Sequence, residues 1–219
     1  MQESHKTELV LFDLDGTLID TAPDFVLSLN KILESNGRKK LNKNIIRSHV
    51  SDGSAKLVEI GFKINENDAE FQKFRNELLN EYEKNLTNES EIFDGVDDVI
   101  SYLNTNNILF GIVTNKPYKY AKPIVSNFEI LNASKVLICP DHLSHIKPDP
   151  EGILLACSKL NINPKNCVYI GDHKKDLEAG INAGAKTIGC MYGYSLSKNE
   201  NYDGSMLVEK AIEIIDLIN

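Results

Sequence analysis

The sequence has little positive charge to offer to a nucleic acid or an anionic membrane. Its 219 residues contain 24 Lys and Arg against 32 Asp and Glu, which gives a formal net charge of −8 at pH 7. Binding to nucleic acid or anionic lipid requires clustered basic residues, so we expect neither partner. No apolar run approaches the roughly 20 residues of a membrane span, and the N-terminal residues lack the apolar segment of a signal peptide. We therefore expect a cytoplasmic protein.

The sequence also lacks paired cysteines. Cys139, Cys157, Cys167 and Cys190 form no Cys-x-x-Cys motif, and each lies among apolar residues. Such cysteines are typical of buried thiols in a reducing compartment. The chain has no internal repeat and no low-complexity linker.

Strand-like apolar runs alternate with helical patterns in most of the chain. The first run, Leu9 to Phe12, is continuous and stops at Asp13, as a buried parallel strand does at its carboxyl end. Later runs of this kind occupy residues 108–113, 136–139, 167–170 and 187–191. This alternation predicts an α/β fold with a doubly wound parallel sheet, in which ligands bind beyond the carboxyl ends of the strands.

A helical segment interrupts this alternation after the first strand. Thr21 and Pro23 favour a helix start, and apolar residues then recur at helical spacing until Gly37. Two shorter helices and one longer helix follow before residue 90. We therefore predict a helical domain at residues 20–90, with the α/β domain formed by residues 1–19 and 91–219.

Two aspartates follow the first predicted strand, in the sequence Asp13-Leu14-Asp15-Gly16-Thr17. Side-chain alternation in an extended segment predicts that the Asp13 and Asp15 carboxylates share one pocket. Gly16 permits the sharp turn that brings the backbone close to a ligand. Crowded carboxylates require a cation between them, and oxygen ligands beside a phosphate suit Mg²⁺. A surface turn of the same composition is the alternative.

A second pair of acids follows the run that ends at Ile170. Asp172 comes after Gly171, and Asp176 lies four residues on, where the first turn of a helix can direct it to the same edge of the sheet. Either acid could instead cap that helix, since acids favour helix N-termini. Capping alone does not explain why both acid pairs follow parallel strands.

Two further motifs follow predicted strands. Thr114 and Asn115 come after Val113, where a hydroxyl and backbone N–H groups can hold phosphate oxygens. Lys147 precedes Pro148 in a loop, where it can neutralise Asp13 and an incoming phosphate. Each motif is common by itself, and it indicates a phosphate site only in combination with the other motifs.

Together and in this order, the motifs at Asp13, Thr114, Lys147 and Asp172 resemble those of the haloacid dehalogenase superfamily. The resemblance covers essentially the whole chain, and within the superfamily it extends to the phosphoglycolate phosphatase group. Three shorter segments are similar to bacterial N-acetylmuramic acid 6-phosphate phosphatases, namely residues 20–25, 139–142 and 192–194. The resemblance implies a Rossmann-like core with a helical cap domain inserted after the first strand.

The resemblance also implies a Mg²⁺-dependent phosphatase acting on a small phosphate monoester, such as phosphoglycolate or N-acetylmuramic acid 6-phosphate. Asp13 would be the nucleophile, Asp15 the acid and base, and Lys147 the cation that balances charge. Thr114, Asn115 and Lys147 would hold the phosphoryl oxygens. The implied Mg²⁺ ligands are Asp13, the backbone carbonyl of Asp15, Asp172 and Asp176. We expect a monomer or a weak homodimer.

Substrate choice is expected to lie in the helical cap. Its loop at residues 49–56 is the candidate for contacting substrate, with Lys56 meeting a carboxylate or hydroxyl group. A plain turn between helices, with Lys56 in solvent, is the alternative.

Two other functions compete with hydrolysis. A phosphotransferase of the β-phosphoglucomutase type uses the same nucleophile and second acid, so the core motifs do not separate it from a phosphatase. A non-catalytic interaction protein on this fold is disfavoured because every ionisable member of the predicted site is present.

Overall fold

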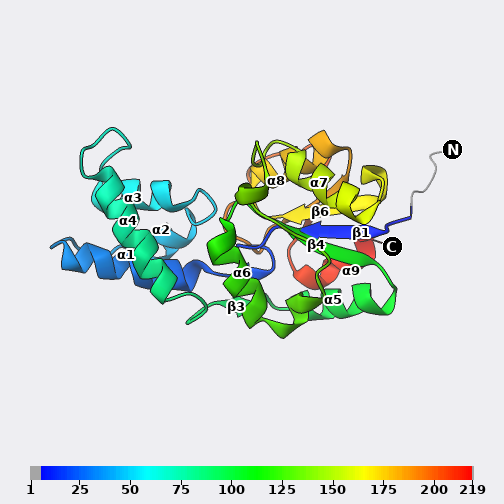
Figure 1. Cartoon of the computed structure of the whole chain (residues 1–219), viewed down its shortest axis with the longest axis horizontal. Coiled ribbons are helices and arrows are strands. Elements are labelled where there is room, and N and C mark those ends of the chain that lie inside the picture. Colours follow the sequence, from blue (N-terminus) through cyan, green and yellow to red (C-terminus); the bar gives the residue numbers. More distant parts are fainter. Residues whose placement is uncertain (1–5, 219) are drawn as a thin grey trace. The chain divides into compact units, whose positions relative to one another are not determined.

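The computed structural model describes residues 6–218, and within them lies a parallel sheet of six strands (Figure 1). These strands are β1 (Leu9–Phe12), β4 (Leu109–Val113), β5 (Leu137–Ile138), β6 (Cys167–Gly171), β7 (Lys186–Cys190) and β8 (Met206–Val208). Their order is β5-β4-β1-β6-β7-β8, and all neighbours run parallel. The predicted doubly wound parallel α/β fold is confirmed.

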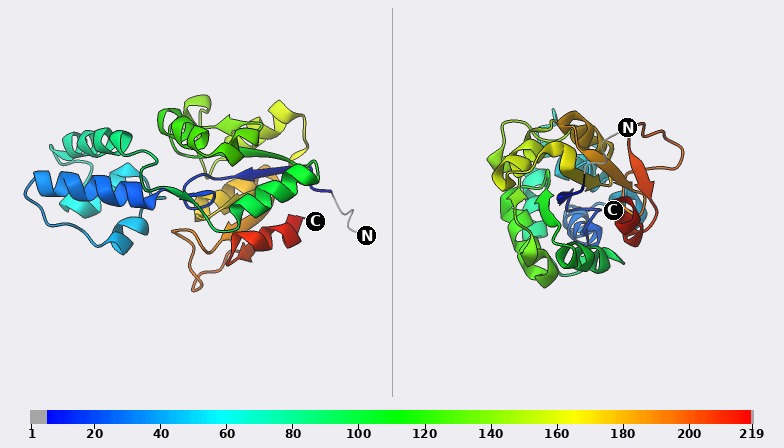
Figure 2. Two further views of the ribbon diagram at one scale, coloured as in Figure 1. Left: turned by 90° about the horizontal axis from the view of Figure 1, so that it is seen from below. Right: turned by 90° about the vertical axis from the view of Figure 1, so that its right-hand side faces the viewer.

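Helices cover both faces of this sheet. They are α5 (Val96–Thr105), α6 (Tyr118–Asn127), α7 (Glu151–Leu160), α8 (Lys174–Ala183) and α9 (Ile214–Ile218), with 3₁₀ turns η1 (Glu129–Ala133), η2 (Pro140–His142), η3 (Pro164–Asn166) and η4 (Ala211–Glu213). Helices α7 and α8 lie on one face, and α5 and α9 on the other (Figures 1 and 2). Because both faces are covered, β1 is buried at every position and is apolar throughout.

The core on the α7 and α8 face fixes the position of β1. Leu9 and Leu11 belong to a buried cluster that also contains Ile153 of α7 and Ala179 of α8. On alternate positions of the strand, the ring of Phe12 meets that of Phe110 edge-on, with a centroid distance of 6.4 Å. Both faces of β1 are therefore held by packing, which sets the position of the residue that follows it.

The chain divides into two compact units. One contains the sheet and comprises residues up to Ile19 and from Ile92 onward, and the other is Asp20–Glu91. The second unit consists of α1 (Ala22–Ser35), α2 (Lys43–Arg47), α3 (Ser54–Phe62) and α4 (Phe71–Lys84). The short strands β2 (Ile19–Asp20) and β3 (Glu91–Ile92) pair where the chain passes between the units. The role of Asp20–Glu91 as a cap stays a prediction.

Stacked aromatic rings hold the helical unit together. The rings of Phe25 and Tyr82 and those of Phe62 and Phe74 lie 3.8 Å apart at 9° in each pair. These pairs join α1 to α4 and α3 to α4, so α1 and α3 both bury apolar side chains against α4.

The four cysteines are free and buried, as predicted. Among residues 6–218, none of the helices has both the length and the apolar character that crossing a bilayer would require.

Candidate active site

Three neighbouring strands bring the predicted motifs to one edge of the sheet. Strand β1 lies between β4 and β6, with Phe12 level with Ile112 and Ile170. The residues that follow these strands therefore emerge at the same carboxyl edge. The backbone N–H of Asp13 donates to the carbonyl of Ile170 at 2.8 Å, which extends the pairing by one residue and fixes the start of the Asp13 loop.

Three buried carboxylates gather at this edge. Asp13, Asp172 and Asp176 each place a carboxylate oxygen within 4.8 Å of the other two. Burial raises the pKa of Asp172 well above its usual value, and the neighbouring Asp176 and Asp13 raise it further. Burial also raises the pKa of Asp13, while Lys147 opposes this shift. The cluster therefore holds more negative charge than its buried surroundings accommodate easily.

This donor set fits a hard divalent cation such as Mg²⁺. All three ligand candidates are carboxylate oxygens, and a bound cation would relieve the repulsion that raises the pKa values of Asp13 and Asp172. Asp176 also accepts a hydrogen bond from the backbone N–H of His173 at 3.0 Å, so it caps α8 as well. The capping and the clustering predicted for this acid are both observed.

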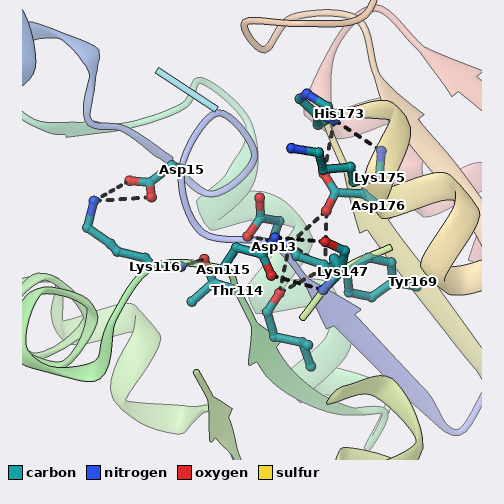
Figure 3. Close-up of polar contacts among 11 residues, drawn as sticks. Asp13, Asp15, Thr114, Asn115, Lys116, Lys147, Tyr169, His173, Lys175 and Asp176 are labelled. Carbon is teal, nitrogen blue, oxygen red and sulfur yellow. Dashed lines mark hydrogen bonds and ion pairs between the residues drawn. The ribbon is translucent and has the colours of Figure 1, made fainter. Parts of the chain in front are cut away.

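Lys147 joins the cluster through ion pairs with two of its acids (Figure 3). Its Nζ lies 2.9 Å from Oδ1 of Asp13 and 2.7 Å from Oδ1 of Asp176. The hydroxyl of Tyr169 accepts from the same Nζ at 2.9 Å and donates to the carbonyl of Val113 at 2.8 Å. Burial lowers the pKa of Lys147, but Asp13 and Asp176 outweigh it and hold this pKa well above the ordinary value. The two acids therefore favour the charged form of the lysine.

Asn115 fixes the backbone that carries this lysine. Its side-chain amide donates to the carbonyl of Lys147 at 3.1 Å, and its side-chain carbonyl accepts from the N–H of Lys147 at 3.1 Å. Thr114 lies beside it, buried, with its hydroxyl accepting from the N–H of Lys116 at 3.2 Å. Both residues lie at the predicted edge, and their phosphate-binding role stays a prediction.

The side chain of Asp15 takes a different position from those of Asp13, Asp172 and Asp176. Its carboxylate is not in the cluster of Asp13, Asp172 and Asp176 but pairs with Lys116, whose Nζ lies 2.8 Å from Oδ1 (Figure 3). Strand β1 ends at Phe12, so the alternation that would put Asp13 and Asp15 on one side does not apply. The strand alternation on which the expected shared pocket was based is therefore absent, and the shared pocket itself stays a prediction. The separate prediction for the Asp15 backbone carbonyl is not affected.

A loop at residues 192–194 contacts Asp172, one of the candidate metal ligands, and the turn that follows Asp15. The N–H of Tyr194 donates to Oδ2 of Asp172 at 2.8 Å, and the hydroxyl of Tyr192 donates to the carbonyl of Thr17 at 3.0 Å. A Cβ on Gly193 would lie 2.5 Å from the carbonyl oxygen of Gly16. The sequence indicated residues 192–194 only through their resemblance, and the structure gives them a positioning contact.

Replacing Gly16 with Ala is expected to displace Asp172. Gly16 has a φ of +77°, and a Cβ there would lie 2.6 Å from Cγ of Asp172. Gly184 is a matched control because its φ is +76° and a Cβ added there would have nothing within 4 Å. Gly184→Ala should lower the free energy of unfolding by about 1–2 kcal/mol through backbone strain alone. Gly16→Ala should lose about 1–3 kcal/mol more through overpacking.

Urea unfolding and Mg²⁺ titration of activity measure both effects. Gly16→Ala should also need more Mg²⁺ for half-maximal activity, whereas Gly184→Ala should not. Equal losses in the two variants would contradict the contact between Gly16 and Asp172.

The predicted cap residue Lys56 lies in the other compact unit. It is in the first turn of α3, because that helix begins at Ser54 and shortens the loop expected at residues 49–56. Its Nζ lies 3.1 Å from Oε2 of Glu59, and its side chain is 42% exposed. Its role in substrate binding stays a prediction.

The chain has a doubly wound parallel sheet, and buried aspartates with a buried lysine lie at the carboxyl ends of its strands. These features place it among the α/β proteins that carry a charged site at this edge of the sheet. The family described as haloacid dehalogenase-like hydrolase matches residues 10–190, and the chain belongs to this family.

Two curated relatives and one solved structure illustrate the match. An N-acetylmuramic acid 6-phosphate phosphatase from Pseudomonas putida is 35% identical over 212 residues, which are 96% of this chain and 95% of that protein. A phosphoglycolate phosphatase from Xanthomonas campestris pv. campestris is 33% identical over 203 residues, 92% of this chain and 91% of that protein.

The crystal structure of a predicted phosphoglycolate phosphatase from Haemophilus somnus aligns with a TM-score of 0.86 at 26% identity, covering 97% of this chain and 98% of that one. The family predicted from the sequence motifs, and a phosphatase within it, are confirmed.

Proposed function

We propose that this chain is a Mg²⁺-dependent phosphatase that hydrolyses a small phosphate monoester through an aspartyl phosphate on Asp13. One observation carries the proposal: the Nζ of Lys147 bridges Asp13 and Asp176 at 2.9 and 2.7 Å, inside a cluster of three buried acids. A carboxylate beside a fixed cation can approach a phosphate dianion that a bare carboxylate would repel.

Asp13 performs the first half of the reaction. A carboxylate oxygen of Asp13 attacks phosphorus as the bond from phosphorus to the ester oxygen breaks, which leaves a phosphoryl group on Asp13. Once its side chain has left Lys116 and carries a proton, Asp15 gives that proton to the departing alkoxide oxygen. In the structure the Asp15 carboxylate forms an ion pair with Lys116, so the side chain of Asp15 has to turn toward the leaving oxygen for this transfer.

Asp15 performs the second half as a base. It takes a proton from the water that attacks phosphorus, and the bond to Asp13 breaks to release inorganic phosphate and restore the carboxylate. Asp13, Asp172, Asp176 and the backbone carbonyl of Asp15 would hold Mg²⁺, which would supply positive charge to the phosphoryl oxygens when bound. Thr114, the backbone of Asn115 and Lys147 hold the same oxygens.

The substrate class is proposed from the relatives. Those reported above act, by name, on N-acetylmuramic acid 6-phosphate and phosphoglycolate, which are both phosphate esters that carry a carboxylate. We propose the sugar-acid phosphate as the substrate, with phosphoglycolate as the alternative. The phosphatase names favour hydrolysis over the mutase that shares the same core residues.

Phosphate release with Mg²⁺, compared for these two substrates in parallel, tests the proposal. A kcat/KM for N-acetylmuramic acid 6-phosphate at least about tenfold above that for 2-phosphoglycolate is expected, because specificity is the ratio of these constants. The reverse ratio would assign the alternative substrate. Isomerisation of glucose 1-phosphate that outruns phosphate release would contradict hydrolysis.

Lys56→Ala tests the predicted cap contact with substrate. If Lys56 meets the substrate carboxylate, KM should rise about tenfold while kcat changes little. Lys73 is a matched control because it is in the same unit and pairs with Glu70 at 3.2 Å, as Lys56 pairs with Glu59 at 3.1 Å. Equal KM values for Lys56→Ala and Lys73→Ala would remove Lys56 from the site.

A further inference from the structure

Lys116 is a buried lysine at the active-site edge to which the mechanism above gives no chemical step. Its side chain is 4% exposed, and its Nζ lies 2.8 Å from Oδ1 and 3.1 Å from Oδ2 of Asp15. Its backbone N–H donates to the hydroxyl of Thr114. A lysine fixed at the backbone and in contact with both oxygens of a carboxylate holds that carboxylate in one orientation.

The charges at this edge indicate why Asp15 needs such a partner. Lys147 neutralises part of the charge of Asp13 and Asp176, and the cluster at Asp172 fits a divalent cation. Asp15 lies outside that cluster, two residues from the proposed nucleophile. A phosphate monoester enters as a dianion, and an uncompensated carboxylate close to its path would repel it.

We propose that Lys116 is a positioning residue that acts through Asp15. It holds the Asp15 carboxylate turned away from Asp13 and neutralises its charge, so that the phosphate group enters without meeting a bare carboxylate. The proposal rests on the proposed function, because it places a phosphate group beside Asp13. In this proposal Lys116 acts on phosphate binding through Asp15, both of whose carboxylate oxygens contact its Nζ.

Binding of inorganic orthophosphate in the presence of Mg²⁺ tests this role without relying on turnover. The dissociation constant is measured by calorimetry for the unaltered protein, Lys116→Met, Asp15→Asn and the double variant. Methionine keeps the unbranched shape of the lysine side chain, one atom shorter, and removes its charge. Lys116→Met should bind phosphate about tenfold more weakly, as expected for one uncompensated charge near the ligand.

The double variant separates the two roles of Lys116. Adding Asp15→Asn to Lys116→Met should restore the dissociation constant to within about twofold of that of the unaltered protein, because the repelling charge is gone. An equal loss with Asp or Asn at position 15 would show that Lys116 binds the phosphate itself and would overturn the proposal. Unchanged affinity in Lys116→Met would overturn it too.

Further measurements keep the result interpretable. If Lys116→Met does not fold, Lys116→Gln takes its place in the same four-way comparison. Separate values of kcat and KM distinguish a positioning role from a merely structural one: Lys116→Met should raise KM for the phosphate ester by a similar factor, measured well below the thermal midpoint of the variant, which the loss of a buried ion pair should lower. If the unaltered protein releases no phosphate with Mg²⁺, the proposed function is overturned as well. If it turns over normally but Lys116→Met weakens phosphate binding equally with Asp or Asn at position 15, only the role of Lys116 is overturned.

Discussion

Replacing Asp13 with Asn should lower phosphate release by at least about 10³-fold, the scale of loss when a covalent nucleophile is removed. The amide has nearly the same shape as the carboxylate but cannot form the acyl phosphate. Phosphate release is measured with Mg²⁺ at saturating substrate. Asp94→Asn is a matched control, because Asp94 is an exposed aspartate of the same unit, and it should keep full activity.

The same variant should fold normally. Burial raises the pKa of Asp13, so its ionised form is costly where it lies, and an uncharged amide removes that cost. Lys147 keeps its second partner, Asp176, at 2.7 Å. Without Mg²⁺, the free energy of unfolding should therefore be unchanged or higher. A large loss of stability would contradict the picture of a crowded acidic cluster, and residual turnover near that of the unaltered protein would exclude Asp13 as the nucleophile.

Replacing Lys147 with Met should remove activity and also destabilise the fold. Its side chain is 4% exposed, and its loss leaves Asp13 and Asp176 buried without this cation. Breaking a buried ion pair from one side costs about 3–5 kcal/mol in the free energy of unfolding. Urea unfolding measures this loss.

Mg²⁺ and a surface lysine provide the controls for Lys147→Met. Adding Mg²⁺ should restore part of the lost stability, because the cation would replace the missing positive charge at Asp13, Asp172 and Asp176. Lys198 pairs with Glu209 at 2.6 Å but is 71% exposed, so Lys198→Met should cost no more than about 1 kcal/mol. Equal losses in the two variants, or no response of Lys147→Met to Mg²⁺, would contradict the buried cluster.

The sequence predicted the sheet and most of its edge because buried parallel strands have a strong local signal. Leu9 to Phe12 is apolar at every position since both faces of β1 are covered, and the acid at Asp13 marks the end of the strand. The same reasoning located Thr114 after β4 and Asp172 after β6. Strand order then brought the three together, as parallel topology requires.

Tertiary packing decided the elements that the sequence did not indicate. Helix α6 contains Pro123 and many polar residues, so its composition argues against a helix. Strand β8 has three residues at the edge of the sheet, which is too short for a periodic signal.

Lys116 was missed for a related reason. A lysine between Asn115 and Pro117 has the composition of an exposed loop, whereas in the structure it is buried and paired with Asp15, a residue distant in the sequence. Its one sequence signal is its position, directly after Thr114 and Asn115 at a strand end. The direction of the Asp15 side chain was likewise set by the turn after β1, where strand alternation has ended.

Trapping the covalent intermediate tests the central claim most directly. The protein is mixed with phosphate ester and Mg²⁺, quenched in acid, reduced with borohydride, which converts an aspartyl phosphate to homoserine, and mapped by mass spectrometry. Homoserine at position 13 is the predicted result, with no homoserine in Asp13→Asn or without substrate. A phosphoryl group on another residue, or turnover with no modification at Asp13, would contradict the proposed mechanism.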